Sequence, residues 1–162
     1  MSKVTVFGAG AWGSTMAQVL SDAGNDVLLW GRSQQVIDEI NSSHTNAKYL
    51  ASHILPSAIT ATTDLSLAFS FSEVYVLAIP AQQIRATLQE WKGNFSSTCT
   101  IVSTLKGIEI SSQKRMTEVI EDVLGPHKIA IITGPNLADE LVLRQPAGAV
   151  AAAATTELAE SI

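Results

Sequence analysis

Apolar and polar positions along the chain divide it into short apolar runs separated by helix-like segments. The runs at Val74–Ile79 and Ile129–Ile132 do not alternate polar with apolar residues, and continuous apolar strands of this kind are buried on both faces of a sheet. Strands that alternate with helices pair in parallel through right-handed crossovers. The pattern therefore predicts an α/β fold, a doubly wound parallel sheet forming a single domain over residues 1–162.

The bounds of the elements follow from where each pattern starts and stops. We expect strands at Lys3–Phe7, Asp26–Trp30, Val74–Ile79, Thr100–Thr104, Lys128–Thr133 and Ala147–Ala154, and helices at Ala11–Ala23, Gln34–Ser42, 64–69, Ala81–Trp91, Ser112–Leu124 and Asn136–Arg144. Gly24 is placed to end the first helix, and Asp64 is placed to cap the short one that runs to Phe69. Residues 46–63 are expected to be irregular.

The first predicted strand leads into a glycine-rich turn at residues 8–13, which read GAGAWG. Gly8 allows the tight turn, Gly10 lets a pyrophosphate approach the backbone, and Gly13 lets the helix pack close to the strand. The amide groups at the helix start, from Ala11 onward, then face the anion. Because the turn follows a strand, opens a helix and precedes a second strand, it predicts a Rossmann-type dinucleotide site. The alternative is a glycine-rich turn used for packing alone.

Two side chains near this turn bear on the cofactor. Trp12 lies inside the turn, where it contacts the cofactor or packs under the loop. Arg32 follows the second strand, at a place where a carboxylate would bind the ribose 2′-hydroxyl of NAD. An arginine there can pair with a 2′-phosphate or stack on adenine. The sequence thus predicts NAD or NADP and favours NADP, the alternative being a solvated Arg32.

Three further strand ends are candidates for the rest of the site, because ligands of open parallel sheets lie at the carboxyl ends of the strands. Pro80 forms the wall beside the nicotinamide or simply stops its strand. Lys106 reaches into the cleft as a charge for a phosphate or a developing oxyanion, or is a surface lysine. Gly134 frees the backbone at its strand end, and Asn136 can cap the next helix. Glu140 is a partner for Lys106 or is solvated.

Charge and composition exclude several classes of function. The net charge of −5 gives no support for nucleic-acid or membrane-surface binding, and no apolar run is long enough to span a membrane. His44, His53 and His127 show no metal-ligand spacing, so we predict surface histidines and no metal. Cys99 is expected to be a small buried hydrophobe rather than a catalytic thiol, and a single cysteine fits a reducing, cytoplasmic compartment.

Several motifs occur together in one order: GAGAWGS at 8–14, LWGR at 29–32, NAKYL at 46–50, AIPAQ at 78–82, STLKGIE at 103–109 and TGPNLADEL at 133–141. Over nearly the whole chain, this combination resembles the N-terminal domain of bacterial NAD(P)-dependent glycerol-3-phosphate dehydrogenases. The resemblance implies reversible hydride transfer between NAD(P)H and dihydroxyacetone phosphate, which gives sn-glycerol 3-phosphate for phospholipid synthesis. It also implies a homodimer for the full-length protein.

The same resemblance implies roles for individual residues. Trp12 and Arg32 contact the cofactor, and Lys106 serves both cofactor and substrate. Gly134 and Asn136 line the substrate position. Ala138, which nothing else in the sequence singles out, contacts the cofactor.

A second, all-helical domain is implied as well, and it supplies the lysine that acts as general acid/base. We therefore expect this chain to be cut from a longer protein and to bind dinucleotide with little or no turnover. The segment TTELAESI at 155–162, which opens like a helix and stops after about two turns, agrees with this. The alternative is a naturally short, frayed tail.

The chain departs from the family pattern at three places. Asn136 stands where serine or threonine is usual, Ser14 stands where threonine is usual, and ASHILP separates Leu50 from Pro56 where the proline often follows directly. Rival interpretations are another two-domain dehydrogenase, of the 3-hydroxyacyl or 6-phosphogluconate type, and a sensor module that binds NAD(P)H without chemistry. The TLKG and GPN motifs argue against the first rival.

Overall fold

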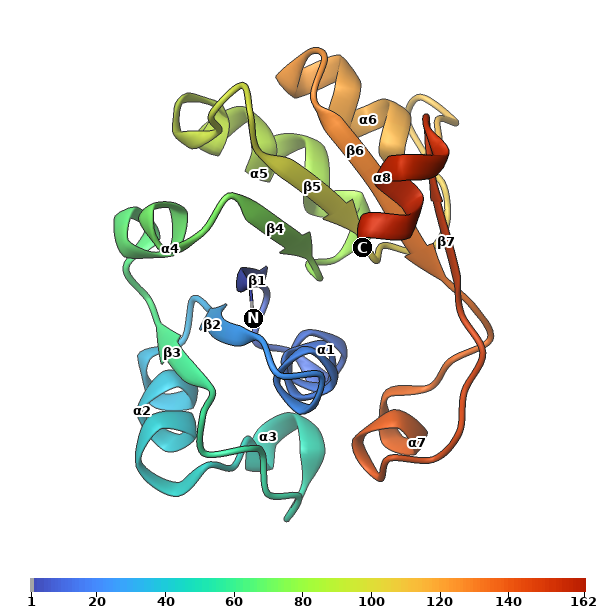
Figure 1. Cartoon of the computed structure of the whole chain (residues 1–162). Helices are drawn as coiled ribbons and strands as arrows, with labels where there is room; N and C mark the ends of the chain where they lie inside the picture. The colour runs from blue at the N-terminus through green and yellow to red at the C-terminus, as the bar shows by residue number, and fades with distance from the viewer. Residues whose placement is uncertain (1) are drawn as a thin grey trace.

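Seven strands form one sheet in the computed structural model, which describes residues 2–162 (Figure 1). The sheet has the order β3-β2-β1-β4-β5-β6-β7. The strands are β1 (Lys3–Phe7), β2 (Asp26–Trp30), β3 (Thr60–Thr62), β4 (Val74–Leu77), β5 (Thr100–Ser103), β6 (Lys128–Thr133) and β7 (Val150–Ala153). The pairs from β3 across to β6 are parallel, with Val6 opposite Leu29 on one side and Val76 on the other. The predicted α/β class with a parallel, doubly wound sheet is confirmed.

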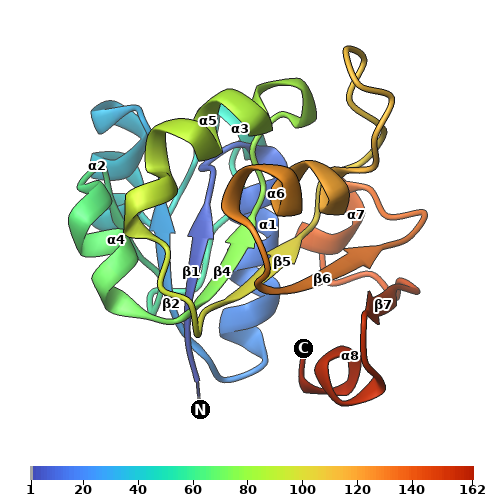
Figure 2. The same cartoon turned by 90° about the horizontal axis from the view of Figure 1, so that it is seen from above.

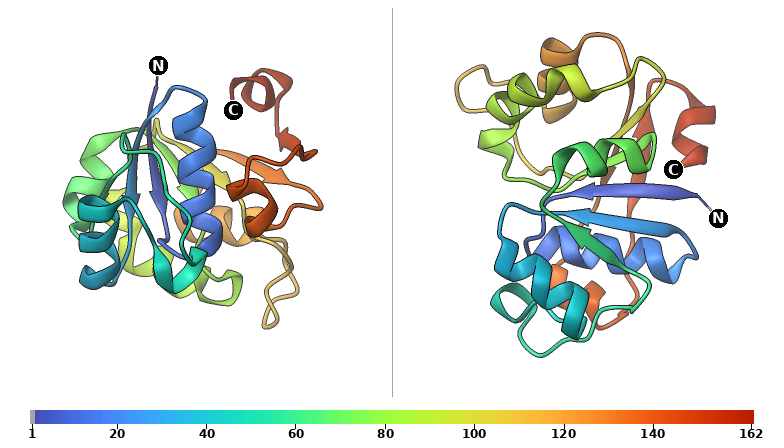
Figure 3. Two further views of the ribbon diagram at one scale, coloured as in Figure 1. Left: turned by 90° about the horizontal axis from the view of Figure 1, so that it is seen from below. Right: turned by 90° about the vertical axis from the view of Figure 1, so that its left-hand side faces the viewer.

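Helices cover both faces of the sheet, as Figures 2 and 3 show. They are α1 (Ala11–Asp22), α2 (Gln34–Ser43), α3 (Ala47–Leu50), α4 (Leu65–Phe71), α5 (Ile84–Trp91), α6 (Met116–Leu124), α7 (Ala138–Val142) and α8 (Thr156–Ser161), with 3-10 turns η1 (Ala81–Gln83) and η2 (Lys92–Asn94). None of the helices within residues 2–162 is long and apolar enough to cross a membrane.

Each face of the sheet buries its own apolar core, because successive strand residues point to opposite faces. Phe7 points to the face covered by α4, α5 and α6. Its ring centre lies 4.8 Å from that of Phe69 and 5.1 Å from that of Trp91. Val6 points to the other face, where it joins the core that α1, α2 and α7 cover. The two cores fix the strand ends, and with them the loops that follow.

Two predicted helix boundaries are confirmed by their capping geometry. Gly24 has a φ of 85°, and its amide group donates to the carbonyl oxygen of Ser21 just after α1. The Asp64 carboxylate accepts hydrogen bonds from the amide groups of Ser66 and Leu67 at the start of α4. Thr155 likewise caps α8.

Two other predicted helices begin later than the sequence suggested. The helix expected from Ser112 begins at Met116, because Arg115 pairs with Ile108 as a β-bridge and its amide group donates to Glu118. The helix expected at Asn136–Arg144 is reduced to Ala138–Val142, and Asn136 does not cap it. Asn136 is buried in the structure, with its backbone carbonyl engaged by Lys106.

The strand assignments need two corrections. Part of the segment expected to be irregular, Thr60–Thr62, is the edge strand β3, which pairs with β2. The last strand, β7, is antiparallel to β6, with Thr133 opposite Val150. The chain leaves β6 and enters β7 at the same end, since α7 packs on α1 instead of recrossing the sheet as a parallel connection requires.

Candidate ligand site at the carboxyl ends of the strands

A cavity of about 670 Å³ opens at the carboxyl ends of β1, β2, β4 and β5. The chain runs from β1 to β2 on one side, whereas β4 lies on the other side of β1, so the cavity is at the point where the strand order reverses. Open α/β sheets bind ligands at this position. The wall consists of residues 8–12, 30–33, Val36, Tyr49, 78–80, Gln83, Thr87, Trp91 and 104–106.

The glycine-rich turn forms the floor of this cavity, and its three glycines differ in what surrounds them. Gly8 has a φ of 121°, and a Cβ there would lie 2.5 Å from the carbonyl oxygen of Ala78. A Cβ on Gly13 would lie 1.7 Å from the carbonyl oxygen of Gly8. A Cβ on Gly10 would meet no atom of residues 2–162 within 4 Å. Two glycines are thus required by packing, and the third leaves the backbone open to the cavity, which fits an approaching pyrophosphate.

Trp12 and Lys106 meet beside the turn. Nζ of Lys106 lies 5.1 Å from the centre of the Trp12 ring and donates a 2.9 Å hydrogen bond to the carbonyl oxygen of Asn136. Nε1 of Trp12 is buried and has no hydrogen-bond partner within residues 2–162. Both residues line the cavity, and Lys106 also lines an adjoining hollow of about 310 Å³. Lys106 therefore lines the cavity, although it belongs to a loop and is exposed.

Arg32, after β2, and Pro80, after β4, both line the cavity, and their strands flank β1 on either side. Arg32 is exposed, and the part of the chain that the structure describes contains no ion pair to it. Pro80 has a φ of −59° and a ψ of 130°. It directly precedes η1, which begins at Ala81, where the sequence predicted the start of the helix. Both side chains are available to a ligand.

Residues 134–140 lie next to the cavity without lining it. A Cβ on Gly134 would lie 2.5 Å from the carbonyl oxygen of Gly148, so the glycine is required by a close approach of the chain. The carbonyl oxygen of Ala138 lies 3.5 Å from Oγ1 of Thr15 in α1. Glu140 is exposed and has no ion pair to Lys106, as its solvated alternative predicted. The ligand contacts of Gly134, Asn136 and Ala138 remain predictions.

The sequence reasoning gave no role to several wall residues, among them Tyr49, Gln83 and Thr87. Tyr49 of α3 reaches the cavity, and it belongs to the NAKYL segment that the resemblance had quoted without a role. Gln83, the last residue of η1, and Thr87 of α5 lie about one helical turn apart and both line the cavity. The helical spacing of these two polar residues after Pro80 is visible in the sequence and could have indicated that both face the cavity.

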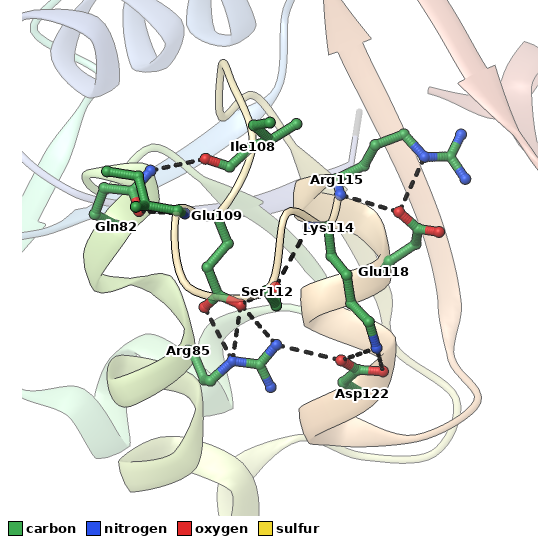
Figure 4. Close-up of polar contacts among 10 residues, drawn as sticks. Gln82, Arg85, Ile108, Glu109, Ser112, Lys114, Arg115, Glu118 and Asp122 are labelled. Atoms are coloured by element: carbon green, nitrogen blue, oxygen red, sulfur yellow. Dashed lines mark hydrogen bonds and ion pairs between the residues drawn. The ribbon is translucent and has the colours of Figure 1, made fainter.

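The loop that follows Lys106 projects from the body of the molecule (Figure 2). A polar network holds its base (Figure 4). The buried carboxylate of Glu109 accepts two hydrogen bonds from Nε of Arg85, at 2.9 and 3.1 Å, and one from Nη2 at 2.8 Å. Arg85 holds the pKa of Glu109 below its ordinary value, and Ser112 contributes further. Gln82 donates to the carbonyl oxygen of Ile108 and accepts from the amide group of Ile110. The network fixes the loop relative to α5 and the Pro80 wall.

The remaining titratable candidates lie apart from the cavity wall. The three histidines are half-buried, which corrects the expectation of surface residues. A ring nitrogen of His53 lies 2.8 Å from Oε1 of Gln18, and burial lowers the pKa of His53. Cys99 is fully buried, as predicted, and burial raises the pKa of its thiol to about 11. Within residues 2–162 there is no group of His, Cys, Asp and Glu residues that could hold a metal ion.

Comparison with known proteins gives consistent matches over almost the whole chain. A family model described as NAD-dependent glycerol-3-phosphate dehydrogenase N-terminus matches residues 3–159. A glycerol-3-phosphate dehydrogenase [NAD(P)+] of Corynebacterium diphtheriae is 45% identical over 99% of this chain and 49% of its own length. One of the same name from Streptomyces avermitilis is 44% identical over 99% of this chain and 48% of its own length. The chain spans about half the length of the curated relatives it matches.

Solved structures agree with the sequence matches. A glycerol-3-phosphate dehydrogenase from Coxiella burnetii superposes with a TM-score of 0.90 at 25% identity, over 99% of this chain and 49% of that one. One from Saccharomyces cerevisiae gives a TM-score of 0.87 at 26% identity, over 96% and 48%. A pyrroline-5-carboxylate reductase from Coxiella burnetii, at a TM-score of 0.72 and 22% identity, shares the fold alone.

Proposed function

The chain belongs to the family of the NAD-dependent glycerol-3-phosphate dehydrogenase N-terminus, and on this basis we propose that it is the NAD(P)-binding domain of an enzyme that interconverts sn-glycerol 3-phosphate and dihydroxyacetone phosphate. The observation that carries the proposal is the cavity at the strand ends, whose floor is the open backbone at Gly10 and whose walls bring together Trp12, Arg32 and Lys106. These residues have the chemistry that a dinucleotide needs.

Four residues of the cavity wall each have a part in holding the cofactor. The pyrophosphate lies over Gly10 and the first amide groups of α1, where the helix dipole favours an anion. Arg32, exposed and without an ion pair in the described residues, pairs with a 2′-phosphate, and so the proposal favours NADP over NAD. Trp12 packs on the cofactor, and Pro80 forms the wall beside the nicotinamide. When bound, the nicotinamide exchanges a hydride with the substrate.

The substrate side lies where Lys106 meets Asn136. The ammonium group of Lys106 is within the cleft, where it attracts a substrate phosphate or stabilises an oxyanion at the reacting carbonyl. Gly134 and Asn136 adjoin that position, and Ala138, at the start of α7, contacts the cofactor. Oδ1 of the buried Asn136 has no hydrogen-bond partner among the described residues.

We propose that a second, helical domain supplies the acid/base group of the reaction. The relatives are about twice the length of this chain, which leaves room for a further domain that carries the acid/base lysine implied by the family resemblance. We propose that this chain binds cofactor with little or no turnover by itself, that the full-length protein is a homodimer, and that it works in the cytoplasm, where a reduced Cys99 is expected.

Titration of the chain with NADPH and NADH, followed by tryptophan fluorescence, tests the cofactor site. Trp12 and Trp30 both line the cavity and report on binding. We expect saturable binding that is tighter for NADPH, and we expect Arg32→Ala to remove that preference. Lys92→Ala is the matched control, because Lys92 is exposed and lies outside the cavity wall. Equal binding of both cofactors by the parent chain would contradict the preference for NADP, and no binding of either would contradict the site.

A substrate panel on a longer protein that carries this chain separates the proposal from its rivals. We expect oxidation of sn-glycerol 3-phosphate and no oxidation of 3-hydroxyacyl or 6-phosphogluconate substrates. Cofactor binding without turnover of any substrate would identify a sensor module instead.

A further inference from the structure

Asn46 lies beneath the glycine-rich turn, far from it in sequence. Its side chain is fully buried at the start of α3. Nδ2 donates a 3.1 Å hydrogen bond to the carbonyl oxygen of Ala9, inside the turn, and a 2.9 Å hydrogen bond to Oγ of Ser14, in the first turn of α1. One amide group therefore joins the two halves of the turn.

The hydrogen bonds fix the orientation of this amide. Both hydrogens of Nδ2 are used, whereas Oδ1 is buried and has no partner among residues 2–162. The reverse orientation would place Oδ1 against the carbonyl oxygen of Ala9, where two acceptors repel. The observed arrangement keeps both donors on the turn even though it leaves an acceptor unpaired.

The bond to Ala9 acts on the next amide group. The carbonyl of Ala9 and the N–H of Gly10 belong to the same peptide unit. A donor on that carbonyl polarises the unit and strengthens its N–H as a donor in turn. Gly10 is the glycine whose surroundings are open toward the cavity. The backbone carbonyl oxygen of Asn46 also accepts from the amide groups of Tyr49 and Leu50 at the start of α3, and Tyr49 lines the same cavity.

We propose that Asn46 is a positioning residue, which sets the orientation of the Ala9–Gly10 peptide and strengthens the Gly10 N–H toward the pyrophosphate of the cofactor. The inference rests on the proposed function, since it assigns a role within the same site. Asn46 acts through the turn and does not touch the ligand.

Three variants test this role by cofactor affinity. Asn46→Ala removes both donors, and Asn46→Asp replaces them with a carboxylate of the same size beneath the bound pyrophosphate. Asn41→Ala is the matched control: Asn41 also makes two hydrogen bonds, at 2.9 and 2.8 Å, to the backbone of Ala61, away from the cavity. We expect NADPH affinity to fall about ten-fold in Asn46→Ala, and further in Asn46→Asp, while Asn41→Ala binds like the parent.

Two further measurements distinguish a positioning role of Asn46 from a general loss of stability. The affinity of Asn46→Asp should recover as the pH falls, because a protonated carboxyl regains a donor, and this variant also serves if the alanine variant does not fold. In the ligand-free chain, the NMR resonance of the Gly10 amide proton should move upfield in Asn46→Ala and stay in place in Asn41→Ala.

Distinct outcomes separate this inference from the function on which it rests. A parent chain that binds neither NADPH nor NADH contradicts the proposed function. A parent chain that binds, together with Asn46 variants of unchanged affinity or an unmoved Gly10 resonance, overturns the role of Asn46 alone.

Discussion

The ammonium group of Lys106 lies 5.1 Å from the centre of the Trp12 ring. Lys106 follows β5, and Trp12 is in the glycine-rich turn after β1. The contact therefore joins two strand ends that β4 separates in the sheet. A cation at this distance from an indole face is attracted to it. The contact holds the lysine over the cavity before any ligand arrives.

Replacing Lys106 by methionine should weaken cofactor binding and leave the fold intact. The variant keeps most of the side-chain stem and loses the charge, so we expect NADPH affinity to fall about ten-fold, by analogy with the loss of other hydrogen bonds to charged groups. An exposed cation–π contact contributes only about 0.5–1 kcal/mol, so the unfolding midpoint should change little. Titrations at low and high salt provide the measurement: binding by the parent should weaken more with salt than binding by Lys106→Met. Lys92→Met is the control, and equal affinities of parent and Lys106→Met at low salt would refute the expectation.

Substitutions of two glycines of the turn should have different effects, one on the stability of the fold and the other on cofactor binding. In Gly13→Ala the new Cβ would lie 1.7 Å from a backbone oxygen, so α1 must move away from β1. Overpacking of this kind costs about 1–3 kcal/mol or more, so we expect a clear loss in the free energy of unfolding. In Gly10→Ala the Cβ meets no atom of the described residues within 4 Å. This variant should be as stable as the parent but bind NADPH poorly, because the methyl group occupies the path of the pyrophosphate. Urea unfolding and fluorescence titration of both variants decide the matter, and a Gly10→Ala chain that binds normally would count against the site.

Much of the fold was predictable because it depends on neighbours in sequence. The turn at residues 8–13 and the caps at Gly24 and Asp64 are local, and each is found where the pattern put it. The strand β3 was missed because Thr60–Thr62 is too short to show a pattern, and its extended state comes from pairing with β2.

The candidate site was predictable where a strand end carries the residue, as for Arg32, Pro80 and Lys106, all of which line the cavity. It was not predictable where tertiary packing decides. Asn136 has the side chain of a helix cap, yet burial and the bond from Lys106 to its carbonyl take it out of that role. The contact of Asn46 with Ala9 spans 37 residues and leaves no local signal.

Cys99 should be unreactive while the chain is folded. The thiol is fully buried, and burial raises its pKa to about 11, so hardly any thiolate exists at pH 8. We expect a thiol reagent to label Cys99 in the native chain only as fast as the chain opens, and to label it at once in denaturant. Labelling followed by mass spectrometry over increasing urea concentrations measures this. Fast labelling without denaturant would mean that the β5 end of the core opens readily.

The pair Arg85–Glu109 should stabilise the chain in a pH-dependent way. Arg85 lowers the pKa of Glu109 in the folded state, so the stabilisation is fully present above the unfolded value of about 4.5 and is lost as the pH falls through the folded value. We therefore expect Glu109→Gln to lower the thermal unfolding midpoint by several degrees at pH 7. The difference from the parent should begin to shrink below pH 4.5, where Glu109 of the unfolded parent takes up a proton, and should vanish once the pH is below the folded pKa of Glu109.

Glu118→Gln is the matched control for this prediction. Arg115 lowers the pKa of Glu118, as Arg85 lowers that of Glu109. The Glu118 side chain, however, is 43% exposed, whereas that of Glu109 is 6% exposed. Solvent screens an exposed pair, so Glu118→Gln should have the smaller effect at pH 7. Thermal scans of parent and both variants from pH 3 to pH 8 make the comparison. A Glu109→Gln deficit of the same size at pH 3 and at pH 7 would show that packing of the loop after Lys106, and not the charge of Glu109, is what the substitution disturbs.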